Sequence, residues 1–97
     1  MSNPHLQPLN DIYLERLAVA RDALIDLRGD GFHAVGVDLD HGAMPTITVE
    51  DGRRCGELVA SGQAANYKWA RGAGGRESWW QWHLKGCRVV WRDRSRA

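Results

Sequence analysis

The chain lacks long apolar runs. No stretch of its 97 residues approaches the roughly 20 consecutive apolar side chains that a membrane-spanning helix requires. Its first residues, MSNPHLQPLND, also lack the basic and then apolar regions of a signal peptide. We therefore expect a soluble, cytoplasmic protein with no membrane partner.

Cysteine is scarce, and the common motifs of catalysis are missing. Cys55 and Cys87 are the only two cysteines and lie in no C-x-x-C spacing, so we expect reduced, buried thiols rather than a disulfide scaffold. A Cys55–Cys87 bond in an oxidising compartment is the alternative. The chain has no G-x-S-x-G, no zinc-ligand spacing and no lysine in its glycine-rich RGAGGR loop. We expect no cofactor and no enzymatic activity.

One short segment, VDLDHG, carries Asp38, Asp40 and His41 close together. Paired carboxylates can bind a hard divalent cation, which would suit a metal-dependent enzyme. No other His or Glu stands at a matching spacing, however, and such a segment is typical of a solvated turn. We predict no metal site and keep the metal-dependent enzyme as a third alternative.

Charge is divided between the two halves of the chain. Residues 1–51 hold nine acidic and three basic side chains, a formal net charge of −6, whereas residues 52–97 hold three acidic and ten basic ones, a net charge of +7. Such asymmetry indicates an interaction, with nucleic acid favoured on the basic side. The alternative is that both halves fold into one globule and attract each other.

Helical periodicity begins at Asn10, a suitable N-cap, and ends near Leu27 or Arg28, before the sequence GDG. At 100° per residue, one face is apolar and the opposite face is acidic. The predicted apolar stripe is Tyr13, Leu17, Ala20, Leu24 and Leu27, and the predicted acidic ridge is Asp11, Glu15, Asp22 and Asp26.

The period then changes to two, which predicts strands. Residues 32–40 place Val35, Val37 and Leu39 inward, and residues 46–50 form a second, antiparallel strand. A short helical turn is expected around residues 57–60. The last third predicts two linked hairpins, one with a four-residue GAGG loop and one with a two-residue Lys85-Gly86 turn.

These two hairpin registers predict which side chains share a face of the sheet. Tyr67 and Trp80 are opposed, as are Trp69 and Ser78, Lys68 and Trp79, Trp80 and Trp91, Trp82 and Val89, and Trp79 and Arg92. Trp69, Trp80, Trp82 and Trp91 then belong to the core, together with Tyr67. Trp79 alone is left on the polar face, within cation–π reach of Lys68 and Arg92.

Aromatic rings interleaved with cations are typical of proteins that bind single-stranded nucleic acid, because bases stack on rings and cations follow the phosphates. We predict a non-enzymatic binding protein whose basic, Trp79-centred sheet face contacts nucleic acid. The candidate binding residues are Lys68, Arg71, Arg76, Trp79, Gln81, His83, Arg88 and Arg92.

A second hypothesis is a protein-interaction module or homo-oligomer. In that case the acidic ridge of Asp11, Glu15, Asp22 and Asp26 and the basic sheet face would meet complementary surfaces, because opposite charges favour such a contact.

The sequence therefore predicts one α+β domain at residues 9–93, with a loose N-terminal arm at 1–8 and a basic tail at 94–97. Its fold class is one N-terminal amphipathic helix packed on an antiparallel sheet of about five strands. The order is α-β-β-β-β-β, with the short helical turn after the second strand.

Three stretches, LNDIYLERLAVARDALIDLRGDGF, VDLDHGAMPTI and GCRVVWRD, resemble small uncharacterised proteins encoded by transposable phages and prophages of proteobacteria. The resemblance implies a phage or bacterial cytoplasmic setting and a nucleic acid, host protein or phage protein as the partner. It carries no functional residues.

Overall fold

The computed structural model describes residues 9–72 and 75–94, which form two helices and five strands. The elements are α1 (Leu9–Gly29), β1 (Ala34–Asp38), β2 (Thr46–Val49), α2 (Arg53–Ala60), β3 (Ala65–Gly72), β4 (Gly75–Leu84) and β5 (Cys87–Arg94). The α+β class is confirmed, and the short turn expected around residues 57–60 is the second half of α2. The arm at 1–8 and residues 95–97 of the tail lie outside the described residues.

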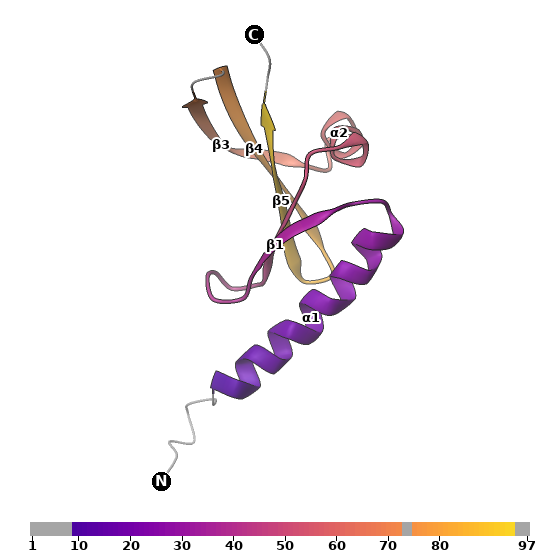
Figure 1. Cartoon of the computed structure of the whole chain (residues 1–97), viewed down its shortest axis with the longest axis vertical. Coiled ribbons are helices and arrows are strands. Elements are labelled where there is room, and N and C mark those ends of the chain that lie inside the picture. The colour runs from indigo at the N-terminus through magenta and orange to yellow at the C-terminus, as the bar shows by residue number, and fades with distance from the viewer. Residues whose placement is uncertain (1–8, 73–74, 95–97) are drawn as a thin grey trace.

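The five strands form one sheet in the order β1-β2-β5-β4-β3, which is mixed rather than wholly antiparallel (Figure 1). Strands β1 and β2, β4 and β5, and β3 and β4 pair antiparallel, but β2 and β5 pair parallel. The Arg88 N–H donates to the Pro45 carbonyl at 2.9 Å and holds the start of β5 beside β2. The prediction of an antiparallel sheet was wrong for this pair, because hairpin periodicity predicts only pairing between neighbours in the chain.

One face of the sheet, here called the inner face, packs against the helices. Its side chains are Ile47, Val49, Trp80, Trp82, Leu84, Cys87, Val89 and Trp91, and α1 contributes Ala20, Ala23 and Leu27 to the same core. Burying apolar surface is the main force that joins the layers. The helix α2 adds Cys55 and Leu58, and the Phe32 ring stacks on Trp82 with centroids 5.9 Å apart.

Both cysteines are buried and free, as the sequence predicts. Burial raises the pKa of the Cys55 thiol and that of the Cys87 thiol, because the interior disfavours the thiolate. Both side chains therefore act as small apolar parts of the core.

The Lys85-Gly86 turn between β4 and β5 is confirmed. Lys85 has φ 46° and Gly86 has φ 79°, and positive φ at both positions is what a type I′ hairpin turn requires. A Cβ atom at Gly86 would lie only 3.3 Å from a methyl group of Val19, so glycine also allows the turn to approach α1. Lys85 Nζ lies 3.0 Å from the Asp26 carboxylate and adds an ion pair to this contact.

Only the C-terminal half of α1 packs on the sheet, and its N-terminal half projects past the ends of the strands (Figure 1). Tyr13 and Leu17, which helical periodicity predicts on the buried stripe, are exposed. A helical wheel predicts which residues share a face, but not how far along the helix the sheet extends.

The projecting half of α1 is held by polar contacts with the loop after β1. The Tyr13 hydroxyl donates to the Asp40 carboxylate, and the Arg16 guanidinium donates to the carbonyls of Leu39 at 2.9 Å and Gly42 at 3.0 Å. Two charge-assisted bonds to carbonyls fix the loop against the helix.

The loop after β1 is closed by Asp38. Its carboxylate accepts the N–H of Asp40 at 2.8 Å and that of His41 at 3.2 Å, and it lies 2.9 Å from His41 Nδ1. The hydrogen bonds from the Asp40 N–H and from the His41 ring both lower the pKa of Asp38, and the bond from Asp40 has the larger effect. Asp38, Asp40 and His41 therefore stabilise a turn. Residues 9–72 and 75–94 contain no cluster of three His, Cys, Asp or Glu side chains suited to a metal.

Strand β1 differs from the prediction in its burial. Val35 and Val37 are predicted to point into the core but are exposed. Leu39, also predicted to point inward, packs against the core. The register shifts between Ala34 and Gly36, and β1 is an edge strand of the sheet. Alternation in the sequence does not distinguish an edge strand from a central one.

The Tyr13–Asp40 contact can be tested by alkaline titration. The hydrogen bond to Asp40 and the charge of that carboxylate raise the pKa of Tyr13, because both disfavour the phenolate. We expect Asp40→Asn to lower this pKa toward its ordinary value of 10.0. Ultraviolet absorbance follows the ionisation of the chain's two tyrosines, and Tyr13→Phe identifies the transition that moves. An unchanged curve in Asp40→Asn would show that the contact does not form in solution.

Candidate nucleic-acid interface

The second face of β3, β4 and β5, here called the outer face, carries the aromatic and basic side chains. Its members include Tyr67, Lys68, Trp79, Gln81, His83, Arg88 and Arg92, together with the acidic Glu77 and the buried Val90. The core formed with both helices lies on the inner face, and Lys68, His83 and Arg92 are exposed. Three adjacent strands thus present these side chains together.

Trp79 lies at the centre of the outer face. Its register partners are Lys68 on β3 and Arg92 on β5, as the sequence predicts. Lys68 Nζ lies 5.6 Å and Arg92 Cζ 5.8 Å from the Trp79 ring centroid, near the outer limit of cation–π attraction. Trp79 is half-buried rather than fully exposed, because these two long side chains flank it.

Tyr67 joins the outer face through a β-bulge, which corrects the predicted register. Asn66, not Tyr67, is opposite Trp80, and the register shifts between Asn66 and Lys68. The extra residue turns Tyr67 away from the core. The Arg88 guanidinium carbon lies 4.3 Å from the centroid of the Tyr67 ring, so a second ring and cation pair stands beside Trp79.

Arg88 is held in place by its neighbour on β4. Its Nε donates to Gln81 Oε1 at 2.7 Å, and Arg88 and His83 are register partners. This bond orients the guanidinium over Tyr67. On the β5 side of Trp79, the Arg92 guanidinium lies 3.7 Å from the Glu77 carboxylate. This ion pair is partly exposed and therefore contributes little to the stability of the fold.

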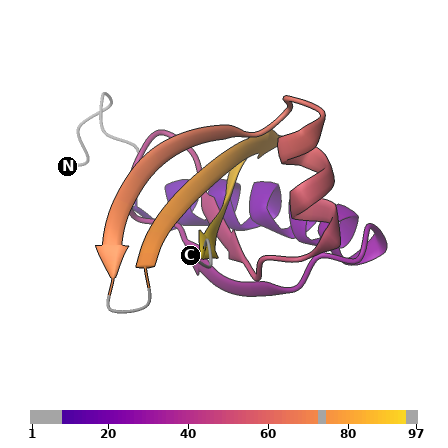
Figure 2. The same cartoon turned by 90° about the horizontal axis from the view of Figure 1, so that it is seen from above.

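Two predicted binding residues, Arg71 and Arg76, do not belong to the outer face. They are register partners near the connected end of the β3–β4 hairpin, on the same side of the sheet as Trp69. Arg76 lies over the Trp69 ring, and Trp69, Ala70, Arg71 and Arg76 line a depression of about 390 Å³. This end of the curved hairpin lies far from α2 (Figure 2).

Trp69 itself is 56% exposed, although the hairpin registers predict it in the core. Trp69 is opposite Ser78 on β4, and Ser78 is opposite Asp93 on β5. This cross-strand row, the Trp69 row, lies beyond the Trp80–Trp91 pair, and none of its three residues belongs to the core. The predicted GAGG loop is also shorter, because Gly72 and Gly75 pair within the strands. The hairpin therefore extends past the region that the helices cover.

The acidic ridge of α1 is partly engaged within the chain. Asp26 is half-buried and pairs with Lys85, and Asp22, which is exposed as Asp11 and Glu15 are, lies 3.5 Å from Arg21. The ridge therefore contributes to docking the β4–β5 turn on α1.

Sequence reasoning missed Tyr67 and misplaced Trp69. A β-bulge leaves no mark in an alternating pattern, so only the Arg88 contact reveals the orientation of Tyr67. The position of Trp69 near the GAGG segment, beyond the last pair of core tryptophans, was the available signal for its exposure.

Together these elements define a small α+β domain with a mixed five-stranded sheet and one basic, aromatic sheet face. A family model described as "Uncharacterised protein" matches residues 1–94, and the chain belongs to that family. Comparison with curated proteins and with solved structures gave no match. Neither helix in the described part of the chain has the length and apolar character to cross a bilayer.

Proposed function

We propose that this chain is a non-enzymatic protein that binds single-stranded nucleic acid through the outer face of β3, β4 and β5. The observation that carries the proposal is the placement of Trp79 and Tyr67 among Lys68, Arg88 and Arg92 on one sheet face. Rings and cations in this arrangement match the base and the phosphate of a nucleotide.

The rings favour single strands over duplexes. A base that is already paired and stacked offers no free face to a ring on a sheet, whereas an unpaired base does. Trp79 and Tyr67 are on neighbouring strands, which are separated by about 4.8 Å in a sheet. Successive unpaired bases can therefore stack along this face without recognition of their identity.

The cations favour a polyanion. Lys68 and Arg92 lie on either side of Trp79, so a backbone whose base stacks on Trp79 passes close to both. Their attraction to the ring is weak at these distances, which allows the ammonium and guanidinium groups to turn toward phosphate oxygens. Residues 52–97, which hold β3, β4 and β5, carry a formal charge of +7, and this local excess attracts phosphate although the whole chain carries only +1.

The test is binding to a fluorescent single-stranded oligonucleotide across a salt series, measured by anisotropy. Three phosphate contacts, from Lys68, Arg88 and Arg92, predict a slope of about −2 for log affinity against log salt, at about 0.7 for each contact. Lys68→Ala removes one contact, and we expect the magnitude of the slope to fall by about 0.7.

The matched control is Arg53→Ala, which removes the same charge from an exposed position on α2. We expect this variant to keep the wild-type slope. The proposal fails if the wild-type chain shows no binding at low salt. It also fails if Lys68→Ala and Arg53→Ala change the slope equally, because that result would indicate attraction by net charge alone.

A further inference from the structure

One carboxylate lies among the cations of the outer face. Glu77 precedes Trp79 by two residues on β4, so both side chains are on the same side of the strand. Only 22% of the Glu77 side chain is exposed, and its carboxylate lies 3.7 Å from the Arg92 guanidinium. A negative charge at this position opposes the binding of a polyanion to the same face.

The stability of the fold does not account for Glu77. Its register partners are Ala70 on β3 and Arg94 on β5, and this row lies beyond the Trp69 row, outside the core. The ion pair with Arg92 is partly exposed, and such pairs add little to stability. The effect of Glu77 on Arg92 is therefore the more important consequence of its position.

Arg92 belongs both to this ion pair and to the proposed binding surface. Its Nη1 lies 3.7 Å from Glu77 Oε1, and its Cζ lies 5.8 Å from the centroid of the Trp79 ring. Carboxylate and phosphate oxygens bind the same N–H donors of a guanidinium. A phosphate whose base stacks on Trp79 must therefore displace Glu77 from Arg92 or share Arg92 with it.

From these contacts we infer that Glu77 competes with phosphate for Arg92 and so limits the affinity of the outer face for single-stranded nucleic acid. The inference rests on the proposed function and adds a control on the same site. Phosphate binds Arg92 in exchange for a carboxylate, whereas a base that stacks on Trp79 displaces no ion pair. Glu77 therefore lowers the share of phosphate in the binding and leaves the share of stacking unchanged.

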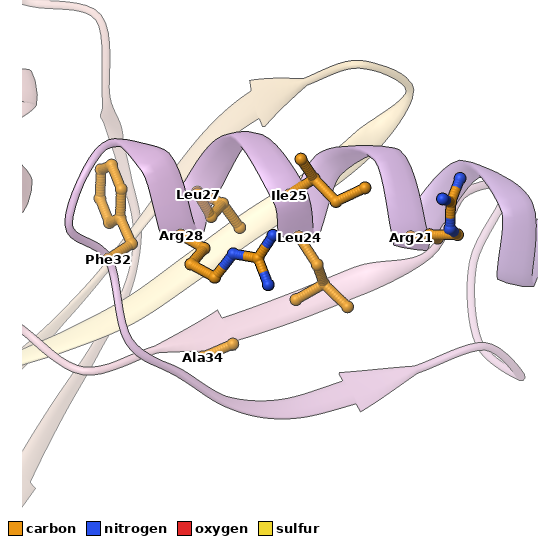
Figure 3. A pocket seen from close by; sticks show the side chains of 7 residues that line it. All are labelled: Arg21, Leu24, Ile25, Leu27, Arg28, Phe32 and Ala34. Carbon is orange, nitrogen blue, oxygen red and sulfur yellow. The ribbon is translucent and has the colours of Figure 1, made fainter.

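The arginines of α1 provide a comparison for Arg92. Arg21 and Arg28 are exposed and line a groove of about 630 Å³ between α1 and the chain that enters β1 (Figure 3). The ring in this groove, that of Phe32, is only 6% exposed and offers no stacking surface to a base. Removing Arg28 thus changes the net charge as removing Arg92 does, but leaves the outer face intact.

Anisotropy with a fluorescent single-stranded oligonucleotide tests the inference. Glu77→Gln removes the charge and keeps the size of the side chain, and we expect it to bind about three- to tenfold more tightly at low salt. The gain should shrink as salt rises, because salt screens interactions between exposed charges. Glu57→Gln is the matched control, since it removes the same charge from an exposed position on α2. We expect it to bind as the wild-type chain does.

A double-mutant cycle tests whether Glu77 acts through Arg92. We expect Arg92→Ala to weaken binding and Arg28→Ala to leave it unchanged. In the Arg92→Ala background, Glu77→Gln should lose its gain, because the effects of two residues in contact are coupled. A gain of the same size without Arg92 would overturn the inference, since it would show general repulsion by the Glu77 charge. So would a Glu77→Gln variant that binds no more tightly than Glu57→Gln.

These results distinguish the inference from the proposed function. If the wild-type chain binds and Glu77→Gln binds no more tightly, the inference fails and the proposed function stands. If neither chain binds at low salt, both fail. Binding by Glu77→Gln alone would support the inference, although the proposed function of the wild-type chain would fail.

Discussion

Replacement of Trp91 by alanine is expected to lower the free energy of unfolding by about 3–5 kcal/mol, the usual cost of truncating a buried aromatic side chain. Trp91 is 1% exposed, lies on the central strand β5 and is opposite Trp80 on β4. Such a loss is a large fraction of the total stability of a domain of this size.

Trp69→Ala provides the comparison, because Trp69 is the same residue type on the neighbouring hairpin but is largely exposed. Its loss removes mainly the contact with Arg76, worth about 1 kcal/mol or less. Urea unfolding of the two variants measures both effects. Equal destabilisation would show that the Trp69 row belongs to the core, as the sequence alone suggests and the structure does not.

Trp79→Ala is expected to weaken binding to a single-stranded oligonucleotide by about 5- to 150-fold, equivalent to about 1–3 kcal/mol for one stacked base. The ring supplies the stacking surface at the centre of the outer face, whereas Lys68 and Arg92 remain in the variant. Its salt slope should therefore stay close to that of the wild-type chain.

Two further variants separate stacking from damage to the fold. Trp79→Phe keeps a flat aromatic ring and is expected to retain most of the affinity. Trp69→Ala removes an exposed ring from the other side of the sheet and is expected to bind as the wild-type chain does. If Trp69→Ala loses affinity and Trp79→Ala does not, the binding face is the depression around Arg71 and Arg76.

The structure formed by residues that are close together in the sequence could be predicted. The Lys85-Gly86 turn has a two-residue signature, and it fixes Trp80 opposite Trp91 and Trp79 opposite Arg92. The helix at 9–29 follows from its periodicity and from the glycine at its end. These features depend on interactions within a few residues, which a sequence pattern records directly.

Features that depend on distant segments could not be predicted. The parallel pairing of β2 with β5 joins strands separated by α2 and two other strands. The bulge before Lys68 moves Tyr67 to the other face without any change in the alternating pattern. The exposure of Leu17 and Val35 depends on where the sheet ends, and this is a property of the assembled layers.

In the candidate site, too, the local register could be predicted from the sequence and the wider arrangement could not. Lys68, Trp79 and Arg92 were grouped correctly because two local hairpin registers agree on them. Charge alone supports the prediction of Arg71 and Arg76 as binding residues, whereas the same registers place them on the side of Trp69. Composition identifies the segment that forms the outer face, whereas register decides which of its cations share that face.

The most direct test of the outer face as a binding surface is an NMR titration with a single-stranded oligonucleotide. The chain's five tryptophans provide five indole N–H signals as separate reporters. We predict that the Trp79 signal shifts with added oligonucleotide, whereas the signals of Trp91 and Trp69 remain in place. Saturable binding in which the Trp79 signal does not move, or in which only Trp69 moves, would contradict the account.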